Sequence, residues 1–169
     1  VTRRDCPEFI KVLYAETADV YAITDYKARY YTIMRNGIEQ DIHMLITANP
    51  STIVEMQNNA NEFFEQYVTD IENGTLNKDL DIAPEVRAKL EPLYKPNPAR
   101  AKELRELKEK YGDGLLPKHY WPNLQVLTTW KCGNTQVYME KFKNSFPENM
   151  LHQEFGYFAS ECRSGLVMN

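Results

Sequence analysis

The feature that most constrains the fold is the alternation of short apolar runs with helical segments. Three runs, at residues 42–47, 124–129 and 150–155, each have the length of one strand, and a fourth lies at residues 166–168. Strands that are separated by helices build a parallel sheet with right-handed crossovers. We therefore expect an α/β fold with a parallel or mixed sheet flanked by helices.

Helical spacing of apolar residues and helix-end signals predict the elements between these runs. Helices are expected over residues 7–15, 25–39, 50–73, 84–94, 98–111 and a stretch after residue 134. The helix 50–73 is the best marked, because Asn49 can cap its start and Gly74 can end it. Residues 75–120 are interpreted as a helical insertion on the surface, and residues 18–23 as a brief strand.

Two finer expectations concern which side chains are buried. The run at residues 42–47 has apolar neighbours, as is typical of a buried parallel strand, and His43 within it is expected in the core. The helix after residue 134 is expected to bury the aromatic and aliphatic face formed by Val137, Tyr138, Phe142 and Phe146.

The carboxyl edge of the predicted sheet is where a ligand is expected, because open parallel sheets bind ligands outside the carboxyl ends of their strands. Three loops leave strands at this edge, at residues 48–50, 130–134 and 156–161. The sequence therefore predicts a site built from these loops.

The third loop carries the side chains best suited to a nucleotide. Tyr157 offers a ring for adenine, Ser160 a hydroxyl for a phosphate oxygen, and Glu161 a carboxylate for Mg²⁺, which prefers carboxylates together with phosphate oxygens and water. The spacing by itself is weak evidence, because it is more typical of an ordinary polar loop.

The second loop is the other candidate. Gly133 permits close approach of the backbone, and Asn134 at a helix start offers N–H groups to an anion, although a plain capped turn has the same pattern. Trp130 and Cys132 are candidates for the lining of an acyl pocket, although a Trp after a strand is more often a core residue.

Five segments in the same order resemble the auxin-responsive-promoter family of acyl-acid amido synthetases. These segments are Ile71-Glu72-Asn73-Gly74-Thr75-Leu76-Asn77, Lys95-Pro96-Asn97-Pro98, Trp121-Pro122-Asn123, Cys132-Gly133-Asn134-Thr135-Gln136-Val137-Tyr138 and Tyr157-Phe158-Ala159-Ser160-Glu161-Cys162. The resemblance covers about residues 40–169 and is looser before that.

The resemblance implies part of the large N-terminal domain of an adenylate-forming enzyme, with ATP and Mg²⁺ as cofactors and a small carboxylic acid and an amino acid as substrates. It implies that Tyr157 lies against adenine, that Ser160 lies at the α-phosphate, and that Glu161 binds the metal. Phe158 and Ala159 would belong to the same nucleotide loop, although both depart from the family pattern. Gly133 and Asn134 would lie near the acyl substrate and the adenylate.

The chain is expected to be a single internal fragment of such an adenylation domain. It begins at Val1, stops within an apolar run, and lacks the Gly-rich phosphate loop and C-terminal lid that the resemblance implies. The isolated fragment is therefore expected to bind ATP weakly and to turn over nothing. Two alternatives stay open: a non-catalytic interaction module derived from this fold, and an acyl-CoA-forming ligase.

Composition excludes several other classes. The net charge of −4 disfavours a nucleic-acid partner, and the three widely spaced cysteines disfavour a disulfide framework. The same cysteine pattern favours a reduced, cytoplasmic location. No run of about 18 apolar residues occurs, so we expect no membrane span. A sheet edge left open after Asn169 makes pairing with a second copy the expected form of self-association.

Overall fold

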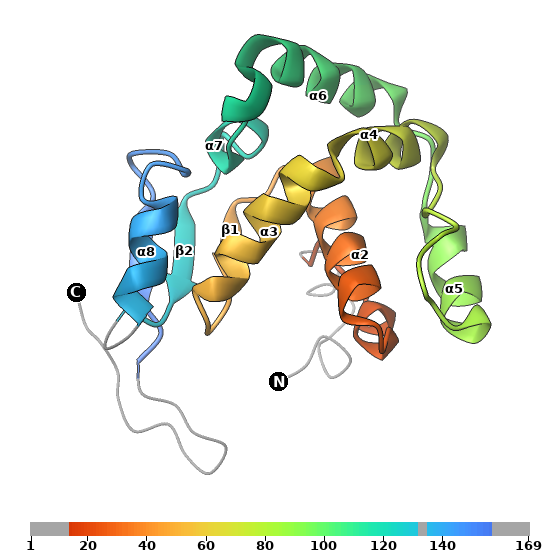
Figure 1. The fold of residues 1–169 in the computed structure, drawn as a ribbon, viewed down its shortest axis with the longest axis horizontal. Helices are drawn as coiled ribbons and strands as arrows, with labels where there is room; N and C mark the ends of the chain where they lie inside the picture. The colour runs from red at the N-terminus through yellow and green to blue at the C-terminus, as the bar shows by residue number, and fades with distance from the viewer. Residues whose placement is uncertain (1–13, 132–134, 157–169) are drawn as a thin grey trace. The chain divides into compact units, whose positions relative to one another are not determined.

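The computed structural model describes residues 14–131 and 135–156, which form two compact units (Figure 1). One unit contains the described residues up to Gln40 together with Asn59–Leu115, and the other contains Asp41–Asn58 together with the described residues from Leu116 onward. The elements, in chain order, are η2 Ala18–Ala22, α2 Tyr26–Glu39, β1 Met44–Ile46, α3 Ser51–Glu62, α4 Phe64–Asn73, α5 Pro84–Leu90, η3 Glu91–Leu93, α6 Pro98–Tyr111, η4 Gly112–Gly114, α7 Pro117–Tyr120, β2 Val126–Thr129, α8 Gln136–Phe142 and β3 Leu151–Glu154.

The first unit is helical, and its core forms where α2, α4 and α6 pack together. Asp25 starts α2 by accepting a hydrogen bond from the amide of Ala28 (2.7 Å). Helical spacing then places Tyr31 on the buried face, where its ring lies 4.5 Å from that of Tyr67 on α4. On α6, Leu104 is fully buried. The predicted helices at residues 25–39 and 98–111 are confirmed.

The long helix predicted over residues 50–73 is wrong at one point, because Phe63 separates α3 from α4. Phe63 has φ −107° and ψ 18°, yet backbone hydrogen bonds continue from Phe63 N to Asn59 O and from Tyr67 N to Phe63 O (3.0 Å each). The ring of Phe63 packs edge-on against Tyr31 (5.8 Å), a tertiary contact that no local pattern reveals. The predicted ends are confirmed, with Asn49 Oδ1 accepting from Ser51 N (3.0 Å) and Gly74 in the left-handed region.

Other predicted elements differ in type or extent. Residues 18–23 contain the 3-10 helix η2 and not a strand, with hydrogen bonds from Val20 N to Thr17 O and from Ile23 N to Val20 O. The helix predicted over residues 84–94 is α5 followed by η3. The helix predicted over residues 7–15 lies almost wholly outside the described residues. The segment 75–120 contributes Leu76 and Leu90 to the buried interior of the helical unit.

The second unit holds a three-stranded parallel sheet in the order β1-β2-β3, which confirms the predicted fold class. Strand β2 is central, and Leu127 pairs with Leu45 on one side and with His152 on the other. Because both crossovers advance in the same direction, right-handed connections place their helices on the same face of the sheet. The ring of Phe142, at the end of α8, lies 6.3 Å from that of His152, and Figure 1 shows α8 alongside β2.

The two faces of this sheet differ sharply in burial. Leu127, on the face that carries the helices, is fully buried, whereas Met44, Ile46 and Leu151 on the opposite face are 55%, 57% and 49% exposed. The expectation that residues 42–47 form a buried strand is therefore wrong, because one face of β1 has no helical layer among the described residues. His43 is likewise exposed and not in the core, and its ring bonds to Asp41 (3.1 Å).

The face of α8 was only half predicted. Phe142 and Phe146 are buried, but Val137 is 66% exposed and Tyr138 is also on the surface. The helix ends at Phe142, so Phe146 reaches the core from the loop that follows and not from a continued helical face.

Candidate functional site

The predicted site residues fall in two segments of the chain that the structure does not describe. Gly133 and Asn134 fall in the short gap at residues 132–134, and the nucleotide-loop residues Tyr157, Phe158, Ala159, Ser160 and Glu161 follow the last described residue, Gly156. All seven lie outside the described residues, so their roles stay predictions. The structure describes the chain that leads into both loops.

The loops start side by side at the carboxyl edge, as the sheet order predicts. The parallel ladder continues past the strand ends, with Trp130 N donating to Ala48 O and Phe155 N donating to Thr129 O (3.0 Å each). The first residues of all three loops are therefore held in one row.

Beyond the ladder, the carboxylate of Glu154 joins two of these loops. Its Oε2 accepts from the amide of Lys131 (2.7 Å), and its Oε1 accepts from the amide of Gly156 (3.2 Å). The ammonium of Lys131, which follows β2, donates to the backbone carbonyl of His152 on β3 (2.9 Å). Glu154 and Lys131 were not predicted from the sequence, because no periodicity or motif marks the last residue of a strand as a bridge to its neighbour.

Trp130 makes a third connection between the same loops. Its indole Nε1–H donates to Gly156 O (3.0 Å), and its ring meets Phe155 edge-on at 6.4 Å. Of the two interpretations offered for Trp130, acyl-pocket lining or core, the structure shows a half-buried ring that braces the chain just before residue 157. Cys132 lies outside the described residues.

His152 lies on the helix-covered face of β3, two residues before Glu154. Its Nε2 shares a hydrogen bond with the fully buried hydroxyl of Thr129 (2.7 Å). Burial lowers the pKa of His152, the positive charge of Lys131 lowers it further, and Glu154 opposes the shift. The imidazole therefore favours its neutral form.

A groove of about 630 Å³ runs along α8 and the loop before β3, with His152 in its wall. Apolar side chains such as Met139 and Met150 alternate with charged ones of both signs, including Lys143 and Glu140, which lie 3.8 Å apart. Trp130 and Glu154 are not among its lining residues, so the groove is separate from the loop starts at the carboxyl edge.

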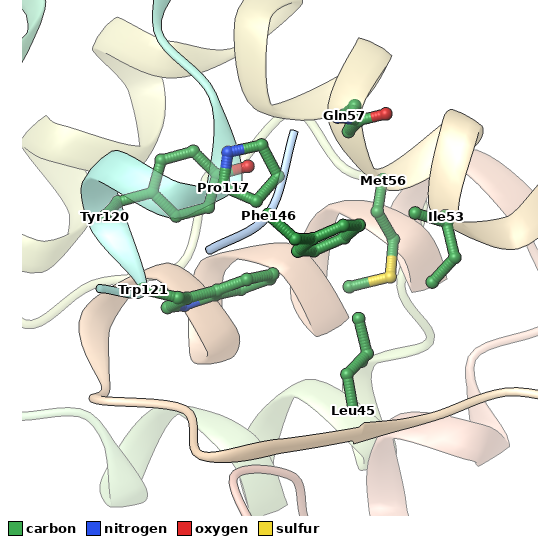
Figure 2. A pocket seen from close by; sticks show the side chains of 8 residues that line it. All are labelled: Leu45, Ile53, Met56, Gln57, Pro117, Tyr120, Trp121 and Phe146. Carbon is green, nitrogen blue, oxygen red and sulfur yellow. The ribbon is translucent and has the colours of Figure 1, made fainter. Parts of the chain in front are cut away.

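A second concave feature in the same unit is packed core. Figure 2 shows the rings of Trp121 and Phe146 beside the thioether of Met56, with Leu45 below them. The space that they enclose admits no water molecule. Trp121 is also stacked edge-on against Tyr120 at 4.9 Å, so the first residue of the Trp121-Pro122-Asn123 motif serves packing.

Two other motifs of the resemblance meet in the helical unit. Gly74 has φ +65°, and a Cβ there would lie 2.4 Å from the carbonyl carbon of Lys95 and from Pro96 N. The amide of Asn97 donates to Ile71 O (2.8 Å). Segments 71–77 and 95–98 therefore fit each other as a structural junction.

Buried charge fixes the same junction. Asp70 accepts from the hydroxyl of Tyr31 (2.8 Å), the hydroxyl of Thr75 (2.7 Å) and the amide of Asn77 (2.8 Å). Arg35, almost fully buried, donates to Thr75 O (3.0 Å) and lies with its guanidinium 3.8 Å from the centre of the Tyr94 ring.

Within the described part of the chain, no group of three or more His, Cys, Asp or Glu residues is placed to hold a metal ion. The described helices include none with the length and apolar character needed to cross a membrane.

Comparison with known proteins gives a family and a fold. The family model described as the GH3 family N-terminal domain matches residues 2–151. Two solved structures match at 16% identity each. The first, "GH3.15 acyl acid amido synthetase", has a TM-score of 0.75, and the match covers 90% of this chain and 28% of that chain. The second, "AtGH3.15 acyl acid amido synthetase in complex with 2,4-DB", has a TM-score of 0.70, and the match covers 84% of this chain and 25% of that chain. No curated protein sequence matches the chain.

The structural matches show the fold, and this chain spans little more than a quarter of the length of the synthetases that it matches. The family model covers most of the chain and agrees with the family that the five sequence segments resemble. The chain therefore belongs to the GH3 family and carries part of its N-terminal domain.

Proposed function

We propose that this chain is part of an ATP-dependent acyl-acid amido synthetase, which joins a small carboxylic acid to an amino acid. The observation that carries the proposal is the match to the GH3 family N-terminal domain over residues 2–151. The convergence of Trp130, Lys131, Phe155 and Gly156 at the carboxyl edge supports it, because these residues lead into the two loops proposed to hold the substrates.

In the proposed reaction, an oxygen of the acid's carboxylate attacks the α-phosphorus of ATP, and pyrophosphate leaves. The amine of the amino acid then attacks the acyl carbonyl and loses a proton, and AMP leaves with the electron pair of the C–O bond. Both steps depend on positioning and on stabilising negative charge, so the enzyme forms no covalent intermediate with its substrates.

Each loop residue has a proposed part in this chemistry. Tyr157, with Phe158 and Ala159, forms the adenine side of the site, and the hydroxyl of Ser160 donates to the α-phosphate. The carboxylate of Glu161 holds Mg²⁺, whose charge offsets that of the phosphates when it is bound.

The acyl side of the site is assigned to the second loop. Gly133 and Asn134 flank the activated carbonyl, where Gly133 lets the backbone approach and Asn134 offers N–H groups.

The test is ATP–pyrophosphate exchange in the full-length protein that contains this chain, with a panel of small carboxylic acids. Glu161→Ala should lower Mg²⁺-dependent exchange by about 10²-fold or more, because it removes the carboxylate proposed to hold the Mg²⁺ that stabilises transition-state charge. Glu109→Ala, at an exposed position on α6, is the matched control and should exchange at the wild-type rate. Wild-type exchange in Glu161→Ala would refute the assignment.

The second half-reaction separates the alternatives. Product release that depends on an amino acid supports the synthetase, whereas dependence on coenzyme A would identify an acyl-CoA-forming ligase. A full-length protein that binds no ATP would be the non-catalytic interaction module.

A further inference from the structure

Glu154 is placed where it can set the separation of the two substrate loops. It is the last residue of β3, and β3 ends two residues before the last described residue, Gly156. One oxygen takes the amide of Lys131, directly before residues 132–134, and the other takes the amide of Gly156, directly before residue 157. The carboxylate thus spans from the β2 loop to the β3 loop.

Among the described residues, the backbone bond between these two segments that lies furthest along the chain is from Phe155 N to Thr129 O. Past it, the links between the described residues of the two segments are made by the side chains of Glu154, Trp130 and Lys131. A carboxylate suits the position, because its two oxygens can each accept an N–H group and hydrogen bonds to an ionised acceptor are the stronger ones. The indole of Trp130 adds a second link to Gly156 O (3.0 Å).

We propose that Glu154 is a positioning residue of the GH3-type reaction, whose carboxylate holds Lys131 and Gly156, the described residues that lead into the acyl loop and the nucleotide loop, at a fixed separation. The proposal rests on the proposed function for its catalytic consequence, but the clamp itself is a property of Lys131, Glu154 and Gly156. Trp130 acts with it through the indole N–H.

Glu154→Gln in the full-length protein is the direct test. The amide side chain keeps one acceptor oxygen and replaces the other with an NH₂ group, which cannot accept, so one of the two backbone amides loses its partner. Amide hydrogen exchange at single-residue resolution should be faster at Lys131 or Gly156, with exchange on α4 and α6 unchanged. Glu140→Gln, on the exposed face of α8, makes the same chemical change elsewhere and should leave both amides as in wild type.

The kinetic arm uses ATP–pyrophosphate exchange. Misplaced reacting groups lower the rate steeply. We expect Glu154→Gln to decrease kcat by about 10- to 100-fold and to raise the KM for ATP. A purely structural defect would lower the amount of folded enzyme without moving KM. Trp130→Phe, which keeps an aromatic ring but loses the indole N–H and part of the ring surface, should shift the same quantities in the same direction by a smaller factor.

The outcomes separate the two proposals. Unchanged exchange at both amides, or faster exchange with wild-type kcat and KM, would overturn the positioning role of Glu154. A full-length wild-type protein without pyrophosphate exchange would refute the proposed function, and the amide-exchange arm would still decide whether the clamp exists. If Glu154→Gln fails to fold, Trp130→Phe decides by the same two measurements.

Discussion

At the scale of single residues, the most constrained described positions of the helical unit make structural contacts. Arg35, Asp70 and Gly74 are buried or conformationally restricted in the helical unit, and their contacts are to backbone and to neighbouring side chains. Removing one partner of such a buried polar contact costs more than the contact itself contributes, because the remaining group stays unpaired. These residues therefore fix the junction between segments 71–77 and 95–98.

Gly74→Ala should be among the most destabilising small substitutions in the chain. A non-glycine residue in the left-handed region costs about 1–2 kcal/mol, and the added Cβ would also overlap the backbone of Lys95 and Pro96. The expected loss in free energy of unfolding is about 3 kcal/mol or more, since overpacking adds about 1–3 kcal/mol. Denaturant unfolding of the wild-type and variant proteins measures it.

Two other glycines separate the causes. Gly112 also has a positive φ (+54°), but a Cβ there would face open space. A Cβ at Gly114 would also face open space, and the φ of Gly114 is not positive. Gly74→Ala should lose more than Gly114→Ala, which adds a Cβ in open space. Gly112→Ala should also lose more than Gly114→Ala, because φ +54° with ψ −130° is a conformation that glycine adopts far more readily than other residues. A loss at Gly74 no greater than about 1–2 kcal/mol, the cost of the left-handed conformation alone, would show that contact with Lys95 and Pro96 has little energetic weight.

At the scale of elements, local signals determined what could be predicted. Helix α6 was predicted to the residue because Asn97 caps it, Pro98 starts it, and Gly112 follows its end. The break at Phe63 and the 3-10 form of residues 18–22 carry no such signal, because neither place contains a Gly or a Pro. The carboxyl edge of the sheet was predicted as the location of the site. The bridge made by Glu154 could not be predicted, because it depends on which strands are neighbours and on their register.

The contact between β3 and α8 should give the protein a pH dependence through His152. Its pKa is lowered in the folded state, so below the ordinary histidine pKa of about 6.5 the unfolded chain binds a proton that the folded chain resists. Stability from the neutral imidazole is present above that pH and is lost as the pH falls. The free energy of unfolding of the wild-type protein, measured by urea denaturation, should therefore decrease as the pH falls from about 7.5 to about 5.5.

Two variants test that cause. His152→Gln removes the titrating group and should flatten the dependence over this range. Lys131→Gln removes a charge that lowers the pKa of His152, so its dependence should fall between those of wild type and His152→Gln. An unchanged slope in His152→Gln would assign the effect to other groups.

At the scale of the whole molecule, the parallel sheet is covered on only one face by the described helices. Parallel sheets are ordinarily buried on both faces. Here Met44, Ile46 and Leu151 remain exposed, because the two crossovers advance in one direction and put α3 and α8 on the same side. The same order leaves β1 and β3 as the outer strands among the described residues, and pairing with a second copy through such an edge stays a prediction.

This one-sided burial predicts unequal costs for equal truncations on the two faces. Leu127→Ala, on the covered face of the central strand, should cost about 2–5 kcal/mol of unfolding free energy, since it opens a cavity where the side chain is fully buried. Ile46→Ala, on the other face and 57% exposed, removes a side chain that is mostly in water and should cost less than about 1 kcal/mol. Both are read from urea unfolding of this 169-residue chain. A large loss at Ile46 would mean that the second face is covered in solution. Repeating Ile46→Ala in the full-length protein then asks whether polypeptide beyond this chain provides the cover, in which case the loss at Ile46 should rise toward that at Leu127.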